Sequence, residues 1–203
     1  MSEVSMSHFN QVANSWDNSE NLQRSEAFAK AIRLHLAGLK FKSILDFGCG
    51  TGLLSGQFYD ETDHILGVDT SFEMLQMFQK KDGDKKVKTI LLDLRSQDLP
   101  GEESFDLILS SMAFHHLDKP EVVLEKLYAR LSPNGRICII DLESEDGSFH
   151  PDNKNMGVKH FGFSNSEIQH WVETKKHPAP DIQTIFQIEK NNRQYGIFLS
   201  VFK

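Results

Sequence analysis

The sequence predicts an α/β protein, a three-layer sandwich with a mostly parallel seven-stranded sheet and an antiparallel C-terminal hairpin strand. Three observations predict it. A short apolar segment runs directly into alternating glycines and then a helical pattern, at 43–59. Further apolar segments alternate with amphipathic ones up to residue 142. Two strand-like segments then close the chain around a short polar turn.

Composition indicates one globular domain, 1–203, with a helical cap at 1–40 and a core at 41–203. The chain has 203 residues, 39% hydrophobic and 25% charged, which is ordinary globular composition. Its net charge of −7 argues against binding nucleic acid. No apolar run approaches the roughly 20 residues that insert into a membrane. The polar N-terminus and the two scattered cysteines favour a cytoplasmic location.

Helical periodicity begins the chain. Phe9–Trp16 and Leu22–Leu39 are expected to be helices. In this cap, Phe9 and Trp16 could cover a ligand site or simply pack on the sheet.

A strand, a glycine turn and a helix follow. Ser43–Phe47 is expected to be a buried strand, and Thr51–Tyr59 a helix. Between them, Gly48, Gly50 and Gly52 would let the backbone turn tightly beside a ligand. This order is typical of a nucleotide-binding unit, but Leu53 stands where a dinucleotide fingerprint needs its third glycine. Nicotinamide-dependent oxidation is therefore disfavoured.

The second strand, His64–Val68, ends at Asp69. A carboxylate there can accept hydrogen bonds from both ribose hydroxyls, which we favour over a purely capping role. Thr70 and Glu73 are expected to form a capping box for the next helix. The third strand, Val87–Leu92, is followed by Asp93.

Phe105–Ser110 is almost wholly apolar, as a central parallel strand should be. Asp118 and Glu121 predict a capping box for a helix whose buried stripe includes Leu131. Arg136–Leu142 is the expected fifth strand.

The segment 143–162 has little periodicity and is predicted to be a lid or binding loop. Ser164 and Glu167 then predict a capped helix to about Thr174. Ile182–Glu189 and Arg193–Phe202 are expected to form the final hairpin.

Several motifs together resemble the class I S-adenosylmethionine-dependent methyltransferases of the small-molecule type. They are the DFGCGTG segment from Asp46 to Gly52, FDLILSSMAFHHL from Phe105 to Leu117, and LSPNGRICIID from Leu131 to Asp141. The resemblance implies a Rossmann-like fold and S-adenosylmethionine as cofactor. It implies that Asp93 meets the adenine amino group, although Asp98 of Asp98-Leu99-Pro100 is an alternative. The implied cofactor-binding residues are Asp46, Gly48, Cys49, Gly50, Asp69, Thr70, Met74, Asp93, Leu94 and Ser110.

The expected function is methyl transfer to a small-molecule acceptor by in-line displacement. The alternative is a cofactor-binding module without transfer activity that acts as a partner subunit. His115 and His116 are the candidate proton acceptors. Candidate acceptor contacts are Trp16, Phe114, His150, His160 and Phe161.

No metal is expected from the sequence. A site built from His115, His116, Asp118, His150 and His160 would need the long loop to fold back, and no paired metal-ligand spacing occurs. Cys49 is not expected to be a nucleophile, because the glycine turn needs a small side chain there.

Overall fold

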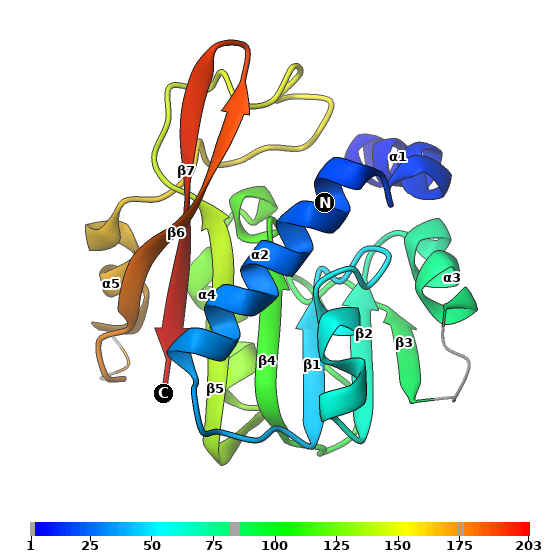
Figure 1. Cartoon of the computed structure of the whole chain (residues 1–203), viewed down its shortest axis with the longest axis vertical. Helices are drawn as coiled ribbons and strands as arrows, with labels where there is room; N and C mark the ends of the chain where they lie inside the picture. Colours follow the sequence, from blue (N-terminus) through cyan, green and yellow to red (C-terminus); the bar gives the residue numbers. More distant parts are fainter. Residues whose placement is uncertain (1–2, 82–85, 174, 176) are drawn as a thin grey trace.

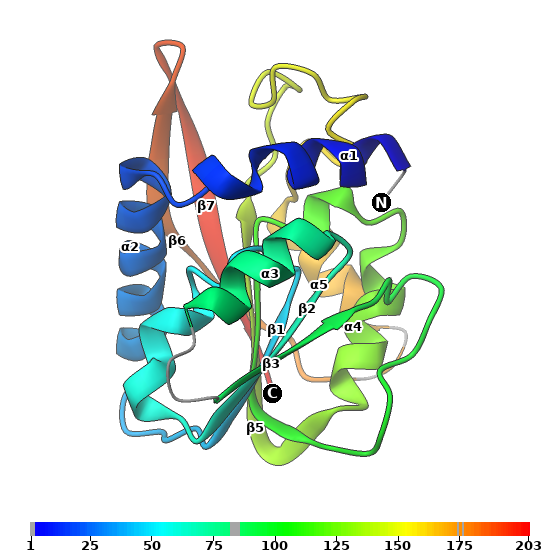
Figure 2. The same ribbon diagram turned by 90° about the vertical axis from the view of Figure 1, so that its right-hand side faces the viewer.

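A computed structural model describes residues 3–81, 86–173, 175 and 177–203. In these residues seven strands form one sheet between two layers of helices (Figures 1 and 2). The strand order is β3-β2-β1-β4-β5-β7-β6. The strands are β1 (Ser43–Phe47), β2 (His64–Asp69), β3 (Val87–Leu91), β4 (Phe105–Ser111), β5 (Leu131–Leu142), β6 (Asp181–Lys190) and β7 (Arg193–Phe202).

Five α-helices and three short 3-10 helices lie in the described residues. The α-helices are α1 (Glu3–Val12), α2 (Ser19–His35), α3 (Phe72–Lys80), α4 (Pro120–Tyr128) and α5 (Asn165–Glu173). The 3-10 helices are η1 (Ala13–Ser15), η2 (Ser55–Glu61) and η3 (Phe114–His116).

The predicted sheet is confirmed. β1 lies at its centre, parallel to β2 on one side and β4 on the other. β7 pairs antiparallel with β5 and with β6. The turn between β6 and β7 uses Asn191 and Asn192, both with positive φ, a conformation that asparagine tolerates well.

Each face of the sheet carries its own hydrophobic cluster. One cluster joins α2, η2 and α3 to the sheet through Phe28, Phe58 and Phe78. The other joins α4 and α5 through Leu124 and Trp171. Figure 2 shows α2 on one side of the sheet and α4 with α5 on the other.

One end of the sheet is left for a ligand. The parallel strands point toward the end where α1 and the loop 143–162 lie (Figure 1). Carboxyl ends of parallel strands are where α/β proteins bind ligands.

Two details of the first half of the chain differ from expectation. The predicted helix at Thr51–Tyr59 does not form as expected. Irregular turns follow the glycines, and the remainder of this segment forms the 3-10 helix η2. The N-cap of α3 is Ser71 rather than Thr70, and its hydroxyl accepts a hydrogen bond from the Met74 amide. The Asp69 carboxylate accepts a hydrogen bond from the Ser71 amide, and this bond holds Ser71 in the capping position.

The N-terminal cap also differs. The helix expected at Phe9–Trp16 is α1, which ends at Val12 before η1. The second expected helix is α2, with Asn18 as its N-cap.

The second half brings further corrections. Asp118 does not cap α4: the N-cap residue is Lys119, and no side chain accepts a capping hydrogen bond there. Leu131 begins β5 rather than closing the α4 stripe. The Ser164–Glu167 capping box is confirmed by reciprocal hydrogen bonds.

The loop 143–162 forms no helix or extended strand, as expected. The predicted helix end at Thr174 lies outside the described residues. Among the described helices, none combines the length and the apolar character needed to cross a membrane.

Candidate functional site

A cavity of about 280 Å³ opens at the carboxyl end of the strands. Its wall combines residues from the glycine turn, the ends of β2, β3 and β4, the N-terminal cap and the loop 143–162. These elements are far apart in the sequence, and the parallel sheet brings them together.

The glycine turn forms one side of the cavity. Gly48, Gly50 and Gly52 all have positive φ, which side chains with a Cβ rarely adopt. A Cβ on Gly48 would lie 2.6 Å from the Cβ of Ala113. The glycines are therefore required both for the turn and for its close approach to the segment after β4.

Asp69 holds this turn in place. One carboxylate oxygen accepts the Gly50 amide at 2.9 Å, and the other accepts the Ser71 amide at 2.8 Å. Burial raises the pKa of Asp69, although these backbone bonds oppose the rise. Each oxygen retains another lone pair, so Asp69 can bind a ligand hydroxyl while keeping the turn ordered.

Two buried polar atoms nearby lack a hydrogen-bond partner among the described residues. They are Asp46 Oδ2 and Thr70 Oγ1. Burial raises the pKa of Asp46 to about 7. Buried polar atoms without partners are unfavourable, and a polar ligand in the cavity would supply what these two atoms lack.

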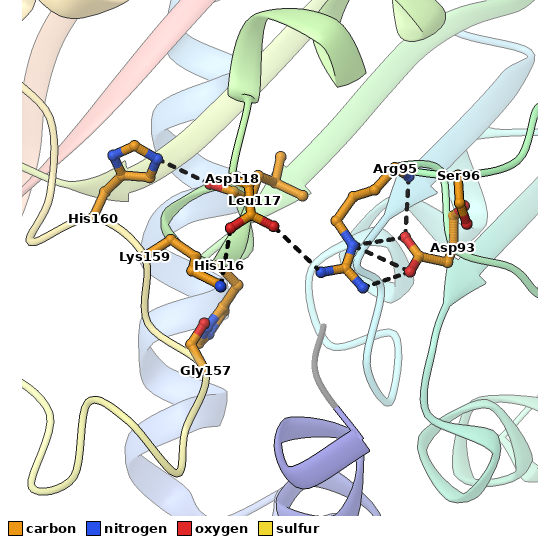
Figure 3. A network of polar contacts seen from close by, with 9 residues as sticks. All are labelled: Asp93, Arg95, Ser96, His116, Leu117, Asp118, Gly157, Lys159 and His160. Atoms are coloured by element: carbon orange, nitrogen blue, oxygen red, sulfur yellow. Dashed lines mark hydrogen bonds and ion pairs between the residues drawn. The ribbon is translucent and has the colours of Figure 1, made fainter.

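The end of β3 carries a second acidic group, Asp93. Its carboxylate accepts hydrogen bonds from the Arg95 side chain, at 2.8 Å for Nε–Oδ1 and 2.5 Å for Nη2–Oδ2. Arg95 also lies 3.9 Å from Asp118, which pairs with Lys159 at 2.9 Å. Figure 3 shows this network running from Asp93 through Arg95 and Asp118 to Lys159 in the loop 143–162.

His115 is held by a buried carboxylate. Its Nδ1 donates to Asp141 Oδ1 at 2.6 Å, and its backbone amide donates to Asp141 Oδ2 at 3.2 Å. Burial would raise the pKa of Asp141, but His115 and its hydrogen bonds hold that pKa below its ordinary value. The Nε2 atom of His115 is buried and has no hydrogen-bond partner among the described residues.

His116 and His150 complete a group of three imidazoles on the cavity wall. His116 Nδ1 donates to the Gly157 carbonyl at 3.2 Å. Burial and the charge of His115 lower the pKa of both His116 and His150 to about 3. Both rings are therefore neutral at physiological pH.

Hydrogen bonds join the loop 143–162 to the segment after β4 that contains His115 and Leu117. The backbone amides of Lys159 and His160 both donate to the His115 carbonyl. His160 Nε2 donates to the Leu117 carbonyl at 2.9 Å. These contacts bring the second arm of the loop beside the cavity (Figure 3).

The N-terminal cap covers the glycine turn. Trp16 lines the cavity, and its indole nitrogen would lie 4.0 Å from a Cβ on Gly50. Asp17 accepts a hydrogen bond from Thr51 at 2.5 Å and pairs with Lys81. The interpretation that the cap covers a ligand site is thus favoured over simple packing on the sheet.

Most of the predicted site residues line this one cavity. Of the cofactor set, Asp46, Gly48, Cys49, Gly50, Asp69, Thr70, Met74, Asp93 and Leu94 do so. Of the acceptor set, His115, His116, Trp16 and His150 do so.

Four predicted residues do not line the cavity. Ser110 is buried in β4, and the next residue, Ser111, takes the wall position. Phe114 is fully buried in the core beside Trp171. His160 is bound to Leu117, and Phe161 is 48% exposed.

Sequence reasoning missed two charged residues. Asp141 was read only as part of the fifth strand, although an acid within an apolar strand is itself a signal for a buried polar partner. Arg24 lies on α2 and faces the cavity. Burial lowers its pKa, and among the described residues its guanidinium forms a hydrogen bond to Asn21 and no ion pair.

Comparison with known sequences agrees with this geometry. The methyltransferase domain family matches residues 45–139. A Schizosaccharomyces pombe protein named as an uncharacterized methyltransferase is 35% identical over 134 residues, which are 59% of this chain and 47% of that one. The chain thus spans about half the length of that relative. A Bacillus cereus protein of the same description is 29% identical over 88% of this chain and 85% of its own.

Solved structures share the fold. A chain from the complex between the Haloferax volcanii Trm112 methyltransferase activator and a methyltransferase has a TM-score of 0.79 at 18% identity, covering 96% of both chains. The DhpI–SAH complex has a TM-score of 0.72 at 16% identity, covering 98% of this chain and 95% of that chain. The chain is thus similar in sequence to proteins named as methyltransferases, and it shares the fold of the DhpI–SAH complex.

Proposed function

We propose that the protein transfers a methyl group from S-adenosylmethionine to a small-molecule acceptor. The observation that carries the proposal is the single cavity in which the glycine turn, Asp69 and the three imidazoles converge. S-adenosylmethionine supplies a sulfonium-bound methyl group that an acceptor nucleophile displaces in line. The chain's own contribution is mainly alignment, which can remove roughly 7–11 kcal/mol of a barrier.

The cofactor half of the proposal assigns roles to residues around the glycine turn. Asp69 would accept the ribose hydroxyls, and Asp93 the adenine amino group. The guanidinium of Arg24 would pair with the carboxylate of the methionine part. Thr70 Oγ1 and Asp46 Oδ2 would gain the polar neighbours that they lack. Solved structures named as complexes with SAH or SAM share this fold, which supports the assignment.

The acceptor would bind on the side of the cavity where the three histidines lie. Asp141 fixes the His115 ring with Nε2 uncommitted, so His115 is better placed than His116 to accept a proton from an acceptor hydroxyl or amine. Trp16 and His150 would contact the acceptor. Related folds include proteins named as phosphoethanolamine and coclaurine N-methyltransferases, which supports a small acceptor. Location in the cytoplasm stays a prediction.

A direct test separates cofactor binding from transfer. Calorimetry should show saturable binding of S-adenosylhomocysteine, and none of NAD. Transfer of a radiolabelled methyl group should then appear for at least one hydroxyl, amine or thiol acceptor in a broad panel. No binding of S-adenosylhomocysteine would contradict the proposal.

A second candidate function is a cofactor-binding subunit without transfer activity of its own. The observation that favours it is the fold match to a chain from a complex with the Trm112 activator. Tight cofactor binding with no transfer by the isolated protein, and transfer after addition of a purified Trm112-type protein, would distinguish an activator-dependent enzyme from an inactive subunit.

A further inference from the structure

Three histidines gather where the loop 143–162 meets the end of β4. One nitrogen from each of His115, His116 and His150 lies within 4.8 Å of the others. The ring centroids are 4.1 Å apart for His115 and His116, and 4.9 Å apart for His115 and His150. Three imidazoles that converge on one wall of a cavity form a typical set of metal ligands.

The hydrogen bonds decide which nitrogens are available. His115 Nδ1 is occupied by Asp141, which leaves the buried Nε2. His116 Nδ1 is occupied by the Gly157 carbonyl, which also leaves Nε2. His150 Nδ1 is buried without a hydrogen-bond partner among the described residues. Two of the three rings therefore hold a buried nitrogen whose bonding capacity nothing in the described protein uses.

The carboxylate behind His115 is a second, independent feature of metal sites. A histidine ligand commonly donates its other ring proton to a carboxylate, which fixes the ring and makes the coordinating nitrogen more basic. Asp141 does this, and it is itself held by the amides of His115 and Leu142. Asp141 is fully buried, so this support for the His115 ring is shielded from solvent.

We propose that His115, His116 and His150 bind a divalent transition metal of the zinc class, with Asp141 positioning His115. Imidazole nitrogens suit zinc, copper, nickel and iron rather than magnesium or calcium. Zinc–nitrogen bonds of about 2.0–2.1 Å place tetrahedral ligands roughly 3.3 Å apart. The nitrogens must therefore approach one another by up to about 1.5 Å, and His150 lies on the loop that can supply this movement.

The three ligands leave a fourth coordination position on the cavity side. This part of the inference rests on the proposed methyl transfer. An acceptor hydroxyl in that position would lose its proton to solvent more readily, because a bound cation lowers its pKa. The acceptor oxygen then forms the new O–C bond as the S–C bond of the cofactor breaks and its electron pair stays on sulfur. His115 acts as a ligand in this arrangement, and the acceptor class is an alcohol, phenol or enol.

The metal site can be tested without any acceptor. The purified full chain is stripped with a chelator, dialysed, and titrated with Zn²⁺ in competition with a chromophoric chelator. We expect one zinc per chain. His116→Ala and His150→Ala should each weaken binding at least tenfold, and Asp141→Asn about 10–100-fold. His170→Ala is the matched control, because His170 is an exposed histidine on α5 paired with Glu173, and it should bind zinc as the wild type does.

X-ray absorption of the zinc-loaded protein should show a nitrogen shell at about 2.0–2.1 Å with imidazole scattering. No stoichiometric zinc binding by the wild type, or wild-type zinc affinity in both His116→Ala and His150→Ala, would overturn the site. Calorimetry with S-adenosylhomocysteine on the same stripped samples reports the proposed function separately. If zinc binds as expected but removing it leaves transfer to an alcohol acceptor unchanged, the assigned role of the metal in acceptor binding is wrong.

Discussion

Asp69 has two tasks, and a substitution should separate them. Asp69→Ala should lower affinity for S-adenosylhomocysteine at least about tenfold, because charge-assisted hydrogen bonds contribute roughly 1.5–3 kcal/mol each. It should also lower stability by about 1–3 kcal/mol, since the Gly50 and Ser71 amides lose their acceptor. Calorimetry and urea unfolding measure the two effects.

Ser71→Ala is the matched control for Asp69. It removes the N-cap of α3 and the bond to Asn10, but it removes no carboxylate from the cavity. Ser71→Ala should lower stability by about 1 kcal/mol. It should reduce affinity for S-adenosylhomocysteine less than Asp69→Ala does. Wild-type affinity in a folded Asp69→Ala protein would refute the ribose role.

Asp46 predicts a pH dependence of stability. Its pKa rises from 3.8 to about 7 on burial in the folded protein, so the folded state binds the proton that the unfolded state has released. Stability therefore falls as pH rises between about 4 and 7, by up to about 1.4 kcal/mol per unit. Asp46→Asn cannot ionise. Without cofactor, its stability relative to wild type should rise by about 1 kcal/mol or more from pH 5 to pH 7.5, measured by urea unfolding.

A stability difference that stays constant over this pH range would show that Asp46 is ionised throughout. The comparison with Asp46→Asn cancels other titrating groups, because both proteins carry them. His115 and Asp141 are included in this cancellation.

At the scale of elements, the N-terminal cap depends on a few polar contacts. Asp17 binds Thr51 and Lys81, and so fastens η1 to both the glycine turn and the end of α3. Asp17→Ala should speed hydrogen exchange in α1 and η1 and weaken S-adenosylhomocysteine binding by severalfold. Glu20→Ala, in the first turn of α2, is the control. Unchanged exchange in both variants would mean that packing alone holds the cap.

The loop 143–162 should respond to ligands unevenly. Near the end of the loop, the amides of Lys159 and His160 donate hydrogen bonds to the His115 carbonyl. Near its middle, the hydrogen bonds between Asp152 and Asn155 are local. We expect protection from hydrogen exchange to increase most at 150–156 when cofactor and acceptor are both present. If only the glycine turn gains protection, the loop is not a lid.

The order of the helices and strands was predicted from the sequence more accurately than the residues at which they begin and end. Strands β1 and β4 were recognisable because buried parallel strands are continuous apolar runs. Helix starts were less certain, because Thr70 and Ser71 are both good N-caps. In the structure, Ser71 is held by the bond of its amide to Asp69 and by the long-range bond of its hydroxyl to Asn10. Phe114 was misplaced for a similar reason: nothing local says that it turns into the core beside Trp171.

Some residues of the candidate site were predicted from the sequence, whereas the contacts between distant residues were not. Asp69 was predicted from its place at the end of a strand, and Asp46 and Asp93 from the family resemblance; all three line one cavity. The pairing of His115 with Asp141 joins residues 26 apart, and sequence spacing cannot show it. His150 was predicted to be an acceptor contact, and it lines the cavity. A metal site that uses it was not expected, because the fold-back of a long loop has no local signature.

At the scale of the whole molecule, the ligand site rests directly on the main hydrophobic cluster. Cys49, Leu54 and Phe78 belong to the cluster that extends from α2 to β7, and Gly67 in β2 lies beneath them. A Cβ on Gly67 would lie 2.9 Å from both Cys49 Sγ and the Phe78 ring. Both neighbours are buried, so neither can move without disturbing the glycine turn.

Gly67→Ala should therefore affect folding and binding together. Overpacking of a buried site costs about 1–3 kcal/mol, and the displaced Cys49 should weaken S-adenosylhomocysteine binding as well. Gly56→Ala is the control, because a Cβ there meets no atom within 4 Å and φ is not positive; it should leave both quantities near wild type. Urea unfolding and calorimetry on the two variants decide the matter. If Gly67→Ala loses stability but binds normally, the glycine turn is mechanically independent of the core beneath it.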